Sequence, residues 1–185
     1  MPATRMWTRD EVLALPDDGQ RYELVDGELL VSPSPRRTHQ RAVRDLFLLL
    51  HHYVEFSKIG EVLFSPSDLD LRTGQLVQPD LFVVAQQSIE ASMEWEHVGV
   101  PALVVEVLSP STAGYDRIKK RRLYQRVGVP TYWIMDLDAR LVEVWTPDSD
   151  RPVIVDGDLS WQPESQVEPL VIHLPEFFQK VWREG

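Results

Sequence analysis

Two carboxylates stand where the sequence is otherwise apolar. Glu106 lies inside the run Ala102 to Leu108, where an unpaired carboxylate would be costly. Asp80 follows Pro79 at the start of a second apolar run, Leu81 to Val84. Two carboxylates on neighbouring strands offer the oxygen ligands that a hard cation such as Mg²⁺ requires. The pair therefore predicts a metal site, while each carboxylate alone could instead serve a structural ion pair or cap the start of a strand.

A site that cleaves phosphodiesters also needs a positive group beside the attacking water and the phosphate. The segment after Glu106 offers Lys119 and Lys120. Asp116, Lys120 and Tyr124 follow at four-residue intervals and would line one flank of a helix. Lys119 lies about 100° around that helix from Lys120, so the two cannot both point into one site. An ordinary surface pair between Asp116 and Lys120 is the alternative.

Charge is unevenly distributed along the chain. The net charge of −10, with 29 acidic and 19 basic residues, at first argues against a nucleic-acid partner. Two segments, Arg36 to Arg44 and Arg117 to Arg126, nevertheless contain several basic residues and no acidic ones. Such runs are often only solvated helix faces, but they also permit a local phosphate-binding surface. We expect both segments to face the side of the metal site and to form one positive patch.

Composition limits the class of protein. A chain of 185 residues with 43% hydrophobic residues suits one domain, residues 1–185, with a single core. The absence of cysteine excludes a disulfide scaffold, a thiolate metal site and a cysteine nucleophile. No segment nears the ~20 apolar residues of a membrane span, so we expect a cytoplasmic protein without a membrane partner. Phosphate-loop, nucleophile-elbow, paired-histidine zinc and dinucleotide motifs are absent from the sequence.

The elements that must position these residues are predicted from hydrophobic spacing and turn signals. Arg21 to Val31 is expected as a hairpin around Asp26-Gly27, with one apolar face and with Glu23 pointing the other way. A long helix should begin at Pro35, with Ser34 as its N-cap, and run to about Lys58.

The run that contains Glu106 should be a central strand covered on both faces, since its apolar residues do not alternate with polar ones. A helix is expected to follow from about Gly114 to Val127. Further helices are expected at Thr8 to Leu15 and Pro175 to Trp182, and further strands at Glu61 to Phe64, Leu69 to Leu71, Pro79 to Val84, Thr131 to Met135, Leu141 to Trp145, Val153 to Val155 and Leu170 to Leu174. These elements predict a mixed α/β domain: a central mixed sheet flanked by helices, with an N-terminal hairpin and C-terminal strands.

The order of these motifs resembles a known family. Pro79-Asp80 followed by Glu106-Val107-Leu108 resembles the split signature of the PD-(D/E)XK nuclease superfamily. Over about residues 7 to 147 the chain is similar to one bacterial branch, the Uma-type restriction-endonuclease-like domain. The similar segments are Tyr22 to Glu28, Ser32 to Gln40, Gln78 to Asp80, Val105 to Asp116, Lys120, Tyr124 and Gly128 to Asp136. The resemblance implies a restriction-endonuclease-like core and a Mg²⁺- or Mn²⁺-dependent endonuclease acting on DNA.

The resemblance also implies roles for individual residues. Asp80 and Glu106 would bind the metal, Lys120 would be the catalytic cation, and Glu23 would lie near the metal. The general superfamily pattern has its lysine two residues after the glutamate, where this chain has Leu108, so the lysine looks moved to the next helix. Substrate-binding roles are expected for Arg36, Arg37, His39, Asp116, Arg117, Lys119 and Tyr124. Without the resemblance, Glu23 would be interpreted as an exposed strand residue and His39 as a capping residue.

Other functions stay open at this point. A catalytically inactive nucleic-acid-binding or regulatory module could share the fold, although it would not need the carboxylates that suit a metal. A metal-dependent hydrolase of RNA or small phosphate esters and a purely structural domain are further alternatives. Many nucleases of the superfamily act as dimers, which leaves a homodimer open.

Overall fold

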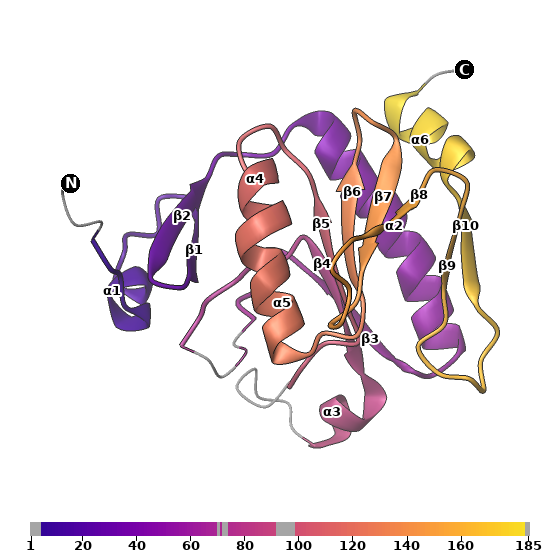
Figure 1. Ribbon diagram of the computed structural model, residues 1–185, viewed down its shortest axis with the longest axis horizontal. Coiled ribbons are helices and arrows are strands. Elements are labelled where there is room, and N and C mark those ends of the chain that lie inside the picture. The colour runs from indigo at the N-terminus through magenta and orange to yellow at the C-terminus, as the bar shows by residue number, and fades with distance from the viewer. Residues whose placement is uncertain (1–4, 70, 72–73, 92–98, 184–185) are drawn as a thin grey trace.

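A six-stranded mixed sheet lies at the centre of the computed structural model, which describes residues 5–69, 71, 74–91 and 99–183 (Figure 1). Its strands, in spatial order, are β3 (Gly60–Phe64), β4 (Leu81–Ala85), β5 (Leu103–Val107), β6 (Tyr132–Asp136), β7 (Leu141–Trp145) and β8 (Val153–Val155). Strands β5 and β6 pair in parallel and the other neighbours pair antiparallel. The predicted mixed α/β class is confirmed.

Strand β5 is buried on both faces, as its continuous apolar run predicts. Val105 packs in the cluster that includes the buried residues of α2 (Arg37–Phe56) and α6 (Leu174–Trp182). Val104 packs in the opposite cluster, which includes the buried residues of α5 (Arg121–Val127). Successive side chains of a strand alternate between faces, so Glu106 points with Val104 toward α5.

The N-terminal hairpin forms as predicted. Strands β1 (Arg21–Val25) and β2 (Glu28–Ser32) pair in the register that joins Val25 to Glu28. Asp26 and Gly27 turn with φ of 49° and 77°, the left-handed values that a tight hairpin turn requires. Helix α1 (Arg9–Leu13), with a capping box between Thr8 and Glu11, covers the outer apolar face of the hairpin, and Glu23 lies on the inner face.

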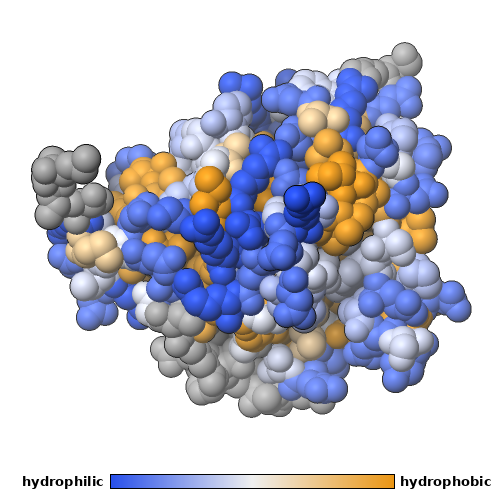
Figure 2. Space-filling model, in the orientation of Figure 1, coloured by the Kyte–Doolittle hydropathy of each residue, from blue (hydrophilic) through white to orange (hydrophobic). Residues whose placement is uncertain are grey.

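The helix predicted after β5 contains an irregular turn. A short helix α4 (Ala113–Tyr115) continues into a π-helical turn (Asp116–Lys120) and then into α5. Gly128 ends the helix with a φ of 81°, in the left-handed region that favours glycine. Surface side chains over this helix are largely hydrophilic (Figure 2).

The expected N-cap of the long helix is wrong. Helix α2 begins at Arg37, and its N-cap Arg36 is extended and makes no side-chain capping bond. Pro33 and Pro35 disfavour helical geometry in the residue before each of them, so the extended path continues past Ser34.

Two elements were not predicted from the sequence. They are α3 (Gln86–Ala91) and β9 (Asp158–Trp161), and β9 pairs with β10 (Leu170–His173) as a separate two-stranded sheet. The strand expected at Leu69 to Leu71 is reduced to an isolated bridge from Leu69 to Val77, and residue 70 lies outside the described residues. Within the described part of the chain, no helix is both long and apolar enough to cross a membrane.

Candidate active site

The strand register brings the two predicted metal ligands to the same end of the sheet. Strands β4 and β5 are antiparallel neighbours that pair Leu81 with Val105, so one further step places Asp80 opposite Glu106. The Oδ2 atom of Asp80 accepts a hydrogen bond from the Val107 amide at 2.9 Å. Both carboxylates are buried, with 4% of Asp80 and 1% of Glu106 exposed. The prediction that both lie at one end of neighbouring strands is confirmed.

Lys120 lies fully buried among three carboxylates. Its Nζ atom is 2.8 Å from Glu106 Oε1 and 2.7 Å from Glu23 Oε1. Asp116 Oδ1 lies 3.5 Å away, so this pair is internal and not the surface pair considered as an alternative. Tyr124 donates its hydroxyl to Glu106 Oε1 at 3.4 Å. The flank of Asp116, Lys120 and Tyr124 therefore points into the molecule against β5.

The buried charges shift one another's proton affinity. Burial raises the pKa of Glu106 well above its ordinary value; Lys120 opposes this shift, and the charges of Asp116, Asp80 and Glu23 add to it. Burial alone would lower the pKa of Lys120, but Glu106, Glu23 and Asp116 raise it well above its usual range. Lys120 therefore stays protonated, and the excess of carboxylates favours an additional proton at Glu106.

Asp80 sits in the opposite electrostatic environment. Its Oδ1 accepts from Arg21 Nη1 at 3.0 Å, and its Oδ2 lies 3.1 Å from His39 Nε2. Burial raises the pKa of Asp80, but the hydrogen bond and charge of His39, the Arg21 guanidinium and the Val107 amide together lower it to about 2. Asp80 is thus ionised at neutral pH, as a metal ligand must be.

Arg21 is a site residue that the sequence analysis missed. Its side chain reaches Asp80, approaches Glu23 Oε2 with Nε at 3.7 Å and donates to the Gln78 carbonyl at 3.3 Å. The Gln78 amide in turn donates to Glu23 Oε1 at 2.8 Å. Arg21 and Glu23 are two residues apart in β1, and that spacing places both on the inner face of the hairpin. This two-residue spacing in the sequence could have indicated that Arg21 faces the site together with Glu23.

The donor set of the site suits a divalent cation. Four buried carboxylates (Asp80, Glu106, Glu23 and Asp116) face two permanent cations, Lys120 and Arg21, which leaves an excess of two negative charges. The buried Glu23 Oε2 and Asp116 Oδ1 atoms accept no hydrogen bond and have only longer ion pairs, at 3.7 Å with Arg21 and at 3.5 Å with Lys120. In the ranges that the structure describes, no three acidic or histidine side chains are grouped tightly enough to hold an ion. Two carboxylates plus waters, the arrangement Mg²⁺ tolerates best, fit these residues.

One groove reaches Asp80, and a second cavity adjoins that groove. A groove of about 710 Å³ is lined by Arg21, His39 and Asp80. A cavity of about 310 Å³ is lined by Arg117 and Trp182. Arg36, His39, Ser109 and Pro110 line both hollows. Arg36 and His39 are therefore placed where a substrate would approach Asp80.

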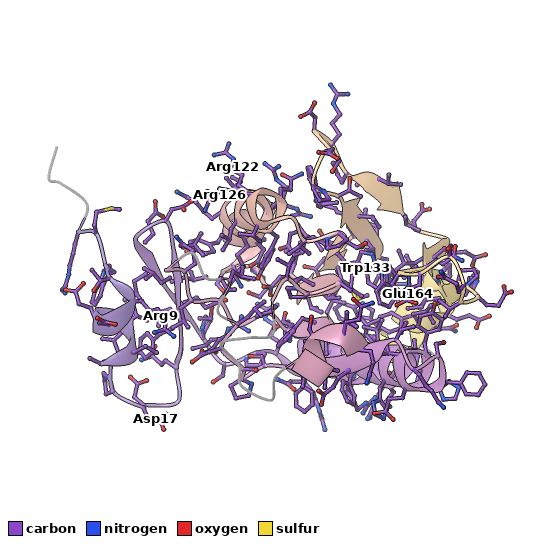
Figure 3. The ribbon with its side chains drawn as sticks, turned by 90° about the horizontal axis from the view of Figure 1, so that it is seen from below. Arg9, Asp17, Arg122, Arg126, Trp133 and Glu164 are labelled. Carbon is purple, nitrogen blue, oxygen red and sulfur yellow. The ribbon has the colours of Figure 1, made fainter. Side chains whose placement is uncertain are left out.

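The expected single positive patch is wrong. Helices α2 and α5 pack on opposite faces of the sheet, and Figure 3 shows α5, with Arg122 and Arg126, across the molecule from α2. The two basic segments meet only where Arg36 and Arg117 line the same cavity.

Several expected substrate-binding cations are engaged by the protein's own carboxylates. Arg117 pairs with Asp136 at 2.9 Å and with Glu143 at 2.6 Å. Lys119 pairs with Glu28 at 2.7 Å, on the outside of the helix as its offset from Lys120 predicts. Arg37 is exposed at the start of α2.

Comparison with known proteins identifies the family. Residues 9–182 match the Uma2 family, whose description is "Putative restriction endonuclease". The chain belongs to the Uma2 family. A crystal structure from Anabaena variabilis, described as a putative nuclease belonging to DUF820, matches 95% of this Uma2 chain and 99% of its own with a TM-score of 0.78. At 19% identity this likeness shows the fold, and it confirms the predicted nuclease-like architecture.

A sequence relative is known as well. An uncharacterized protein of Synechocystis sp. is 31% identical to the Uma2 chain over 108 residues. The match covers 57% of this chain and 54% of the relative, so the chain spans about half the length of the curated protein that it matches. The family agrees with the PD-(D/E)XK resemblance of the motifs and places the chain in a nuclease-like group.

Proposed function

We propose that this chain is a Mg²⁺- or Mn²⁺-dependent endonuclease that cleaves DNA, with Asp80 and Glu106 as the metal ligands and Lys120 as the catalytic cation. The observation that carries this proposal is the burial of Lys120 at 2.8 Å from Glu106, beside a strand register that sets Asp80 opposite Glu106. A structural domain gains little from four carboxylates around two cations in its interior, because each buried charge is costly.

The protein's own residues have distinct roles in this proposal. Arg21 and the Val107 amide fix the Asp80 carboxylate, and Glu23 and Asp116 hold the ammonium of Lys120 in place. Lys120 orients the attacking water and neutralises charge that develops on the phosphate. The bound cation supplies Lewis-acid activation of that water and of the phosphate.

Plasmid cleavage tests the proposal directly. Supercoiled DNA is incubated with the purified chain and Mn²⁺, Mg²⁺ or EDTA, and nicked and linear products are measured. We expect cleavage with either metal, none with EDTA, and loss of cleavage in Asp80→Asn and Glu106→Gln. Glu28→Gln, which removes a surface carboxylate that pairs with Lys119, is the matched control and should keep activity.

A second candidate is an inactive nucleic-acid-binding or regulatory module on the same fold. The specific observation in its favour is that both oxygens of Asp80 already have protein partners and that Lys120 is shared by three carboxylates. Under this alternative the chain binds DNA without cleaving it, and Mn²⁺ does not raise its melting temperature.

Two further parts of the proposal concern assembly and location. We propose a homodimer in which two sites address two DNA strands, and a cytoplasmic protein. Sedimentation of the full chain with and without DNA tests the first, since a monomer throughout would contradict it. Cell fractionation tests the second.

A further inference from the structure

Cations from two helices gather at one corner of the molecule. The start of α2 and the end of α6 lie at the same end of the fold (Figure 1). Arg41 of α2 donates to the carbonyl of Val181 in α6 at 3.3 Å, which joins the two helices. The basic side chains of this corner, here named the α2–α6 cation cluster, are Arg37, Arg41, Arg44, Lys180 and Arg183.

Within the described residues, the cluster has little compensation from acidic side chains. Asp45 forms an ion pair with Arg44, with its Oδ1 atom 2.6 Å from Nη2, and its Oδ2 atom lies 3.6 Å from Lys180 Nζ. Among the interactions of the described residues this is the single carboxylate paired with the five cations. Partial burial lowers the pKa of Arg41, and the charges of Arg183, Arg37 and Arg44 lower it further. This repulsion between like charges destabilises the folded protein when no anion is bound.

The helix dipoles favour the cations that α6 contributes to the cluster but not the cation at the start of α2. Lys180 and Arg183 stand at the C-terminal end of α6, where the helix dipole favours cations. Arg37 stands at the N-terminal end of α2, where the dipole disfavours them, and that first turn contains no acidic residue. A bound anion would relieve both the repulsion and the unfavourable dipole.

Residues adjacent to the cluster in the sequence line the hollows beside the candidate active site. Arg36, the residue before Arg37, lines the groove that contains Asp80, and Trp182, the residue before Arg183, lines the adjoining cavity. His39 lines both hollows, is only 8% exposed, and its Nδ1 atom has no hydrogen-bond partner. A buried, unsatisfied polar atom beside a hollow points to a ligand that approaches there.

We propose that the α2–α6 cation cluster binds the phosphate backbone of the DNA that is cleaved, on the side of the site opposite α5. The identity of the ligand rests on the proposed function. Arg37 and Arg44 are seven residues apart, about 10.5 Å along the helix axis, or about three nucleotide steps of ~3.4 Å. The cluster can therefore contact successive phosphates of one strand as it approaches Asp80.

DNA binding in EDTA separates this surface from catalysis. The full chain is titrated onto a fluorescent duplex of roughly 20 base pairs at several salt concentrations. Arg37→Gln/Arg183→Gln is compared with Arg122→Gln/Arg126→Gln, which removes the same charge from α5. All four side chains are exposed, so both variants should fold, and melting curves check this.

We expect the Arg37/Arg183 variant to bind several-fold more weakly at low salt, with a slope of log affinity against log salt about 1.8 smaller. The Arg122/Arg126 variant should stay close to the wild type. Equal losses in both variants, or no loss in the first, would overturn the proposal. Plasmid cleavage in Mn²⁺ distinguishes the proposed endonuclease from the proposed binding surface. If the Arg37/Arg183 variant binds like the wild type and the chain cleaves DNA, the binding surface is wrong and the endonuclease stands. If binding depends on the cluster and the chain does not cleave DNA, the endonuclease is wrong and the binding surface stands.

Discussion

The two basic segments of the chain look alike in sequence and differ in the fold. After β5, Arg117 and Lys119 are paired with carboxylates, and Lys120 is buried among three more. At the start of α2, Arg37 and Arg41 have mainly like charges around them. Neither segment contains an acidic residue, and the strands that supply acids to the second one are β1, β2, β5, β6 and β7. A basic run thus indicates a phosphate surface only once its tertiary partners are known.

The cations of the second segment also differ in how much each contributes to the stability of the fold. A half-buried pair at the surface, such as Lys119–Glu28, contributes ~0–1 kcal/mol to stability. Removal of one member of a buried charge cluster costs about 3–5 kcal/mol, because it leaves an uncompensated charge in the interior. Neighbouring residues Lys119 and Lys120 fall into different classes, and this difference can be tested.

The largest expected effect follows from Lys120→Ala. Loss of a well-placed charge from a transition-state site typically lowers the rate about 10²- to 10³-fold, and unfolding should become about 3–5 kcal/mol easier. Lys119→Ala should change cleavage little and stability by less than ~1 kcal/mol. Cleavage at saturating DNA, measured at a temperature where melting curves show both variants folded, gives the comparison.

Two results would change this interpretation of Lys120. Equal small losses of cleavage in both variants would leave Lys120 with a structural role in the buried charge cluster and no role in catalysis. If Lys119→Ala did not cleave DNA and Lys120→Ala did, Lys119 would be the catalytic cation instead of Lys120.

Metal addition should give the next largest effect. A ligand that binds only the folded state stabilises it by about 2.7 kcal/mol at a hundred times its dissociation constant, or roughly 5–11 °C in melting temperature for a chain of this size. The Mn²⁺ shift should be lost in Asp80→Asn and Glu106→Gln and kept in Glu28→Gln. A shift of the same size in all four proteins would place the metal elsewhere.

A smaller effect is expected from pH in the absence of metal. Burial raises the folded-state pKa of Glu106 above its ordinary 4.5, so the stability linked to its protonated form is present below pH 4.5 and is lost as the pH rises toward the folded pKa. The wild type should therefore lose melting temperature relative to Glu106→Gln between pH 5 and 8, by about 2–4 °C for each kcal/mol. Melting in EDTA across this range measures it, and a constant difference would show that Glu106 keeps an ordinary pKa.

The smallest effect is expected at the single acid of the α2–α6 cation cluster. Asp45→Asn removes its negative charge, so DNA binding should tighten slightly and the salt slope should rise by up to ~0.9. Anisotropy titrations at several salt concentrations measure both quantities. Weaker binding in this variant, with an unchanged melting curve, would mean that Asp45 positions Arg44 and does not merely oppose the cluster.

Local periodicity was sufficient to predict most of what positions the site. Continuous apolar runs gave the strands of Asp80 and Glu106, four-residue spacing gave the inward flank of Lys120, and the Asp26-Gly27 turn set the hairpin register. The inward position of Glu23 follows from that register. The same two-residue rule extends to Arg21, whose role was missed because its partner Asp80 is 59 residues away.

Features that depend on tertiary partners were beyond the sequence. The pairing of Arg117 with Asp136 and Glu143 requires knowledge of which strands surround the helix. The meeting of Arg41 with α6 joins residues 140 positions apart. The start of α2 was misplaced because a favourable capping residue, Ser34, lies between two prolines that hold the chain extended.

The π-helical turn from Asp116 to Lys120 sets the rotational position of Lys120 on its helix. Each residue of a regular helix advances about 100° around the axis, and a π-turn absorbs an extra residue without breaking the helix. The turn therefore sets the angular relation between Lys120 and the buried Leu123 and Tyr124, which anchor α5 to the sheet. Deletion of Ile118 would restore a regular helix only by rotating one half against the other. Length in this segment is thus as constrained as residue identity. A single-residue deletion would separate the Lys120 ammonium from its carboxylates, although Lys120 and all of the carboxylates would still be present.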